Sequence, residues 1–106
     1  MPEFNWSTSE KAIARKVFHG ALDAELQQLV REAKARTASI NEPSELWKLE
    51  RWRGECRAEI DRKYYYRYSM LPMIFAQLLK QGRIAYNDLQ GLAPEKIEVI
   101  RGVSRL

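Results

Sequence analysis

Residues 46–69 read LWKLERWRGECRAEIDRKYYYRYS, and the expected fold is built around this stretch. It holds two of the three tryptophans and four of the five tyrosines in the chain. On an α-helix, in which each residue turns by about 100°, its apolar side chains fall along one stripe. The members of that stripe are Leu46, Leu49, Trp52, Cys56, Ile60 and Tyr64. We therefore expect a helix whose apolar side packs against a core.

The opposite side of the same helix is polar and holds the candidate functional site. Its residues recur at spacings of three and four, with Arg57 at the edge, one turn before Asp61. A tryptophan among charged side chains, beside backbone that a glycine leaves bare, is typical of a surface that binds another protein. We expect a partner-binding surface or a dimer interface at Trp47, Glu50, Arg51, Gly54, Arg57 and Asp61. Both roles stay open for Trp47, because large aromatic side chains occur at both kinds of surface.

The chain before this helix predicts a second long helix. Ser7 and Glu10 have the spacing of a capping box, which predicts a helix over about residues 8–38. With 106 residues, the chain is long enough for one domain, expected over residues 1–106. A domain of this size has a small core, and a dimer would enlarge it.

The central helix is expected over about residues 42–67, with Asn41 as its cap. Its length is greater than a small globular domain needs, which favours a bundle or a dimer. Arg53 projects toward the apolar stripe. We expect its guanidinium group either to reach solvent at the rim or to meet an acid such as Glu25 or Glu32.

The last third of the chain predicts a group of short helices over about residues 69–106. Ser69 is the expected cap of the first, Gly82 its expected end, and Pro94 opens the last. No segment predicts a β-strand. The expected fold is therefore all-α, with two long helices and a small C-terminal helical head, assembled as a homodimeric helical bundle.

Composition and motifs point away from an enzyme and away from a membrane. The net charge of +4 comes from 18 Lys+Arg and 14 Asp+Glu, mixed along the chain as on a solvated helical surface. One cysteine, Cys56, and one histidine, His19, exclude an intramolecular disulfide and a Cys/His zinc site within one chain. The sequence has no phosphate-loop, nucleophile or metal motif. It also lacks a secretion signal and a run of about 18 apolar residues. We therefore expect a cytoplasmic protein with no cofactor and no catalytic residue.

Residues 62–68 leave a nucleic-acid surface as an alternative, because aromatic rings can stack on bases while arginines hold phosphates. Consecutive tyrosines on a helix point to different sides, with Tyr64 toward the core, Tyr65 outward and Tyr66 elsewhere. The pattern therefore favours tyrosines that pack at a helix end over a stacking platform, and nucleic acid is the less favoured partner.

Several short motifs are similar to those of one known family. They are L-W-K-L, an arginine ten positions after the tryptophan, E-I-D, K-Y, R-x-S and I-F-A-Q-L-L-K-Q-G, in this order from Glu45 onward. With them, the chain resembles the fluorescence recovery protein of cyanobacteria and its homologues. The resemblance implies a non-enzymatic, all-α homodimer. It also implies binding to the photoactivated orange carotenoid protein, whose return to the resting orange form such proteins accelerate, which helps to end quenching of phycobilisome fluorescence.

The same resemblance carries over to individual residues. It matches Trp47 to the functional tryptophan of the family and Arg57 to its functional arginine. The family pattern has a histidine and an aspartate three and four positions after the tryptophan, where this chain has Glu50 and Arg51. The second replacement reverses a charge, and charges at a recognition surface select the partner. Two partners remain open: the orange carotenoid protein, or another protein bound by the same scaffold.

Overall fold

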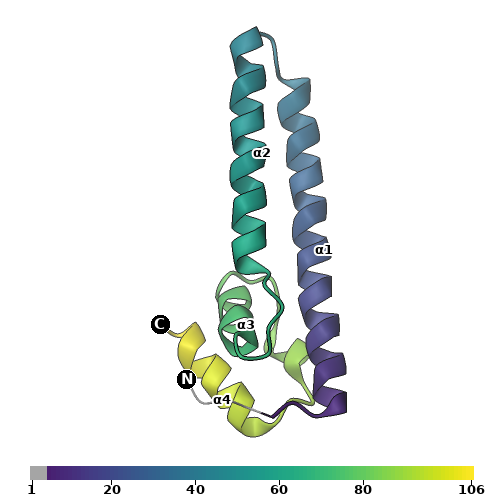
Figure 1. Cartoon of the computed structure of the whole chain (residues 1–106), viewed down its shortest axis with the longest axis vertical. Helices are drawn as coiled ribbons and strands as arrows, with labels where there is room; N and C mark the ends of the chain where they lie inside the picture. The colour runs from purple at the N-terminus through teal and green to yellow at the C-terminus, as the bar shows by residue number, and fades with distance from the viewer. Residues whose placement is uncertain (1–4) are drawn as a thin grey trace. The chain divides into compact units, whose positions relative to one another are not determined.

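The structure, a computed structural model, describes residues 5–106 and is helical (Figure 1). Its elements are α1 (Thr8–Ala38), α2 (Pro43–Lys63), α3 (Leu71–Lys80), the 3-10 helix η1 (Tyr86–Leu89) and α4 (Pro94–Ser104). Residues 5–106 contain no β-strand. The predicted all-α fold, with two long helices followed by short ones, is confirmed. Residues 1–4, on which the expected lack of a secretion signal partly rests, lie outside the described residues.

The chain divides into two compact units. Leu22–Tyr64 forms one unit, which we call the hairpin. Met1–Ala21 and Tyr65–Leu106 together form the other, which we call the head. The N-terminal part of α1 belongs to the head and its C-terminal part to the hairpin. The expectation of one domain over residues 1–106 stays a prediction.

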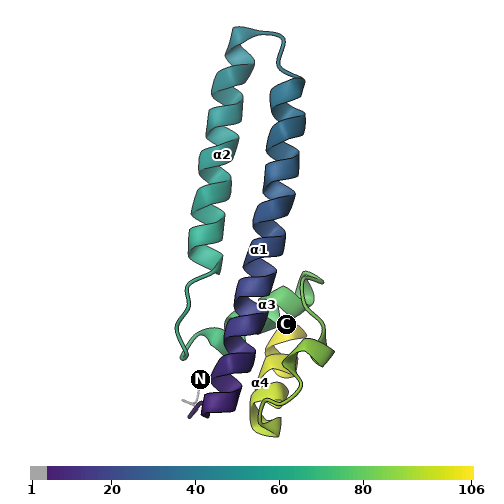
Figure 2. The ribbon, with the colours of Figure 1, turned by 90° about the vertical axis from the view of Figure 1, so that its right-hand side faces the viewer.

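In the hairpin, α2 and the C-terminal part of α1 lie side by side and run in opposite directions (Figures 1 and 2). The N-cap of α2 is Glu42, with an extended backbone (φ −109°, ψ 142°), and Pro43 follows in the first turn. Asn41, the predicted cap, instead donates its backbone N–H to Glu45 Oε2 at 3.0 Å. The predicted cap was therefore one residue too early. The Glu45 carboxylate accepts a hydrogen bond from the backbone of Asn41 and so orders the turn before the helix.

The helix α2 ends at Lys63, four residues before the predicted end at residue 67. Tyr64 leaves helical geometry with φ −105° and ψ 59°, while its N–H still donates to the carbonyl oxygen of Ile60 at 2.9 Å. The Tyr64 hydroxyl donates to Glu25 Oε1 of α1 at 2.7 Å. This tertiary hydrogen bond outweighs the weak preference of tyrosine for another helical turn, which explains the early end.

The head is built around side chains with almost no exposure. Its largest fully buried side chains are Phe18, Leu71, Pro72, Phe75, Leu78, Leu89 and Ile100. Phe18, from α1, packs edge-on against Tyr66 with 4.9 Å between ring centroids. The helix α3 begins after Met70, so the predicted cap at Ser69 was one residue early. The predicted stop at Gly82 is confirmed, and its φ of 73° explains why a glycine is needed there.

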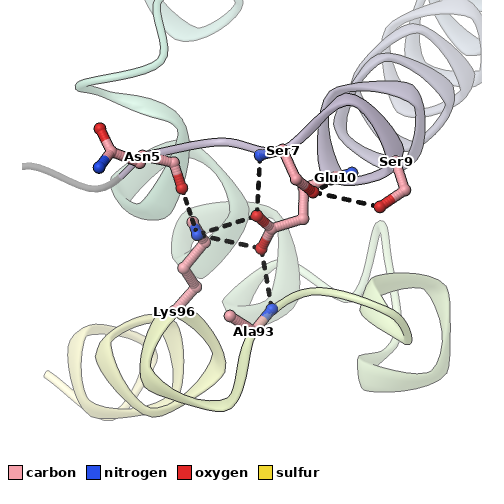
Figure 3. A network of polar contacts seen from close by, with 6 residues as sticks. All are labelled: Asn5, Ser7, Ser9, Glu10, Ala93 and Lys96. Carbon is pink, nitrogen blue, oxygen red and sulfur yellow. Dashed lines mark hydrogen bonds and ion pairs between the residues drawn. The ribbon is translucent and has the colours of Figure 1, made fainter.

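A buried ionic network joins the start of α1 to the start of α4 in the head (Figure 3). The predicted capping box is present: Glu10 N–H donates to Ser7 Oγ at 3.2 Å, and Ser7 N–H donates to Glu10 Oε1 at 3.0 Å. The same carboxylate accepts from Ala93 N–H at 2.9 Å and pairs with Lys96 Nζ at 3.0 Å. The Lys96 ammonium also donates to the carbonyl oxygen of Asn5 at 2.8 Å. A cap that the sequence predicts as local therefore also holds two segments of the head together.

Candidate partner-binding surface

The candidate surface lies on α2, in the hairpin. Trp47, in the second turn of the helix, keeps 71% of its surface exposed. Arg51, Gly54 and Asp61 are exposed as well. A Cβ atom added at Gly54 would meet no atom within 4 Å, so this glycine leaves open space on the outer side of α2. The helical periodicity of the sequence therefore places a large indole beside bare backbone, on the side that faces solvent.

Two ion pairs on α2 join neighbouring turns of the helix. Arg53 Nη2 donates to Glu50 Oε1 at 2.7 Å, and Arg57 Nε donates to Asp61 Oδ2 at 3.2 Å. The hydrogen bond from Arg53, followed by its charge, lowers the pKa of Glu50. All four side chains are more than half exposed, so these pairs add little stability. They do determine which charges on this surface are already neutralised.

The pairing of Arg53 also resolves an open expectation. Its guanidinium group meets neither Glu25 nor Glu32 but lies at the surface with Glu50. Of the two expected outcomes, the structure therefore shows the first: the guanidinium group of Arg53 reaches solvent at the rim. Glu25, one of the two acids expected for Arg53, pairs with Lys63 instead.

The apolar side of the hairpin is incompletely covered in a single chain. Ile60 is buried, but Leu46 of α2 keeps 50% of its surface exposed, and Leu26 and Val30 of α1 keep 41% and 52%. Two hollows follow this side, with volumes of about 560 Å³ and about 420 Å³. The stripe predicted to pack in a core is therefore only partly covered in one chain, with Ile60 buried, Leu46 exposed and its other members half-buried. Apolar side chains gathered in this way mark an interaction surface.

The hollows separate the candidate residues into two groups. The residues that border a hollow are Trp47 and Glu50 at the larger one and Arg57 at the smaller one. The residues that line neither are Arg51, Gly54 and Asp61. The structure thus places half of the predicted site beside the apolar side of the hairpin and half on the outer side of α2.

Sequence reasoning missed a buried network at the base of the hairpin. Lys63 Nζ lies 2.8 Å from Glu25 Oε1, and the two side chains are only 5% and 10% exposed. The same oxygen accepts the Tyr64 hydroxyl. Lys63 follows Cys56 by seven residues, so it falls on the apolar stripe, where a lysine needs a buried acid. That spacing is the signal from which this pair could be predicted, whereas the expectation for the acids of α1 names only Arg53.

The tyrosine run does not form a platform for stacking bases. Tyr65 is exposed, but Arg67 lies over its ring with 4.8 Å between the guanidinium carbon and the ring centroid. Tyr66 is half-buried and stacks on the exposed His19 with centroids 6.0 Å apart. Burial, followed by the neighbouring Tyr68, raises the pKa of Tyr66 to about 12. Tyr66 therefore packs within the head, as the favoured interpretation of this run predicts, while Tyr65 stays at the surface.

The remaining chemistry of the described residues is modest. Cys56 is half-buried, and burial, followed by the charge of Glu32, raises the pKa of its thiol, which disfavours the reactive thiolate. Within residues 5–106, no group of three or more His, Cys, Asp or Glu side chains is placed to hold a metal ion. No helix in the same part of the chain has both the length and the apolar character that crossing a membrane takes.

Comparisons with known proteins agree on one family. The family model of the photoprotection regulator fluorescence recovery protein matches residues 6–104. The fluorescence recovery protein of Synechocystis sp. PCC 6803 is 36% identical over 104 residues, which cover 98% of this chain and 95% of that protein. Its solved structure covers 96% of this chain with a TM-score of 0.91 and matches over 100% of its own length. The structure of the Fremyella diplosiphon fluorescence recovery protein gives the same coverage and TM-score at 34% identity.

Proposed function

Because this chain belongs to the fluorescence recovery protein family of photoprotection regulators, we propose that it binds the photoactivated orange carotenoid protein and accelerates its return to the resting form. One observation carries the proposal. Trp47 and Arg57, the residues that match the functional tryptophan and arginine of the family, are both exposed on α2. An indole and a guanidinium group on one exposed helix are frequent hot spots of protein binding.

The regulator acts by binding, in the cytoplasm, and catalyses no chemical step on its partner. To accelerate the return, it must bind the transition state between the two forms more tightly than it binds the photoactivated form, because only that difference in affinity lowers the barrier. Surface contacts supply such a difference without any catalytic group.

We further propose that the protein is a homodimer held by the apolar side of the hairpin. Leu26, Val30 and Leu46 expose apolar surface there, which a second copy would remove from water. A two-fold dimer brings the same side of both chains together, so each copy fills the hollows of the other. Trp47 borders the larger hollow, and it can therefore contact the second copy, the partner or both.

The alternative partner is another protein, bound by the same scaffold. The observation that favours this alternative is the charge of Arg51, an exposed cation at the position where the family pattern has an aspartate. A reversed charge at a contact can prevent binding of the original partner.

The deciding experiment adds the purified protein to photoactivated orange carotenoid protein and follows the return to the orange form in the dark. We expect faster recovery than without the protein, and co-elution of the two proteins on size exclusion. Unchanged recovery combined with separate elution would contradict the proposal and favour the alternative partner. The resting carotenoid protein is the control, since it should co-elute less.

A further inference from the structure

The net positive charge of the chain lies in the head. The head, residues 1–21 and 65–106, has nine Lys+Arg and five Asp+Glu, whereas the hairpin, residues 22–64, has nine of each. The head therefore carries the whole net charge of +4, and the hairpin carries none. A distribution of this kind gives one unit a positive field that the other unit lacks.

The part of α1 that belongs to the head contributes three of these cations. Arg15 and Lys16 are exposed. Lys11, one turn before Arg15, is half-buried, and its ammonium lies 5.3 Å from the ring centroid of Tyr68. No Asp or Glu occurs over residues 11–22. We call Lys11, Arg15 and Lys16 the α1 cation surface.

The charge of the α1 cation surface is not balanced locally. None of its three members forms an ion pair within residues 5–106. The positions three and four residues away from each of them, where a helix places a partner, hold no acid. Glu10, the acid next to Lys11 in the chain, is buried and is held by Lys96 at 3.0 Å.

The basic tyrosine run, residues 62–68, has less free charge than its sequence indicates. Arg62 pairs with Glu59 at 2.8 Å, and Lys63 pairs with the buried Glu25 at 2.8 Å. Arg67 is the cation of this run that pairs with no acid in the described chain. The charge that an anionic partner could use therefore lies on α1 rather than in the tyrosine run.

We propose that the α1 cation surface binds the phosphate backbone of a double-stranded nucleic acid, without regard to base sequence. A duplex presents about one negative charge per 1.7 Å of its axis and keeps its bases stacked inside. The rings of Tyr65 and Tyr68 have cations over them, so the head offers charge but no bare ring on which an unpaired base could stack. A duplex therefore fits this surface better than a single strand. The activity is separate from the proposed function and does not depend on it.

Other anionic partners fit the α1 cation surface less well. A lipid surface would need apolar side chains beside the cations, to enter its acyl region. A protein partner would need an apolar or aromatic anchor at the centre of the contact. The large apolar side chains that the described part of the head exposes are Tyr65, Met70, Met73, Tyr86 and Leu106, and none of them lies on α1.

The test follows the fluorescence anisotropy of a short labelled DNA duplex as protein is added. The unchanged chain is compared with two double variants, Arg15→Glu with Lys16→Glu and Arg31→Glu with Lys34→Glu. Arg31 and Lys34 are exposed in the hairpin part of α1, so the second variant makes the same change in net charge and is the matched control. We expect the first variant to lose at least about tenfold in affinity and the control to lose less than about threefold.

Salt provides a second readout. If the α1 cation surface neutralises three phosphates, the affinity of the unchanged chain should fall about 40-fold between 50 and 200 mM salt, and that of the first variant much less. Circular dichroism checks that both variants keep their helices, which exposed positions should allow.

Each other outcome overturns the inference. Unchanged anisotropy with the unchanged chain at 50 mM salt refutes nucleic-acid binding and leaves the proposed function standing. Equal losses in the two variants would show that binding follows net charge rather than the α1 cation surface. Tighter binding of a single strand of the same length would refute the choice of a duplex. Sedimentation with anionic phospholipid vesicles, without binding of the duplex, would assign the surface to a membrane.

Discussion

The head and the hairpin differ in how much of their apolar surface one chain can bury. In the head, Phe18, Phe75 and Ile100 are almost inaccessible to solvent. In the hairpin, Ile60 is the buried apolar side chain, while Val30 and Leu46 stay about half exposed. The head therefore has a core of its own, whereas the hairpin is a surface that a second molecule completes. Substitutions of the same kind should consequently act on folding in the head and on association in the hairpin.

The largest expected effect is the loss of a core side chain in the head. Phe75→Ala removes a ring with 0% exposure and should lower the free energy of unfolding by about 4 kcal/mol. Urea denaturation measures this change in the free energy of unfolding. Met73→Ala, at an exposed position of the same helix, is the control and should cost less than about 1 kcal/mol. Similar losses for both variants would mean that the head has no such core.

A charge on the apolar side of the hairpin should act on association instead. Val30→Glu places a carboxylate where a second copy would cover it, and should weaken the dimer by about 3 kcal/mol. Sedimentation equilibrium measures the change. Ala24→Glu, at an exposed position of the same helix, should leave the dimer unchanged. A dimer that tolerates Val30→Glu would place the interface elsewhere.

A smaller effect concerns the pH dependence of the head. Burial alone would raise the pKa of Glu10, but hydrogen bonds from Ser7, Ala93 and Lys96 lower it from 4.5 to about 2. A carboxyl group with a depressed folded-state pKa adds stability above its unfolded pKa, and this stability is lost as the pH falls through the folded value. Between pH 4.5 and about 2, the chain should lose about 2 kcal/mol through Glu10, after allowance for screening by nearby solvent.

Acid titration followed by circular dichroism measures this loss, with Glu10→Gln as the comparison. The variant is less stable at neutral pH, because Lys96 loses its buried partner, but its stability should vary less over the acid range. Parallel curves for the two proteins would show that Glu10 does not carry the pH dependence.

The sequence predicted what depends on local spacing. The capping box at Ser7 and Glu10 and the glycine at position 82 act within one turn of their helices, so the ends they predict are correct. The predicted end of α2 was wrong, because the hydrogen bond from Tyr64 to Glu25 joins residues far apart in the chain. The pairing of Lys63 with Glu25 was missed for the same reason.

The sequence predicted which residues of the candidate site share a side of α2, but not which of its charged side chains form ion pairs. The helical period alone predicts that Trp47 is exposed on α2, and only the structure shows that it borders the larger hollow. Which acids and arginines pair depends on side-chain conformations that spacing does not determine, since Arg57 has Asp61 one turn away while Arg51 has Glu55 at the same spacing and does not pair with it. Which of the two arginines is paired therefore becomes visible only in the structure.

Two exposed aromatic residues, one in each unit, allow a test of the hairpin as the functional surface. Trp47 lies in the hairpin, and Tyr86, with 43% exposure, lies in the head. The measurement is the dark recovery rate of photoactivated orange carotenoid protein with Trp47→Ala and with Tyr86→Ala. We predict that Trp47→Ala loses most of the acceleration, while Tyr86→Ala retains it. Full acceleration by Trp47→Ala, or its loss in Tyr86→Ala alone, would contradict the assignment of function to the hairpin.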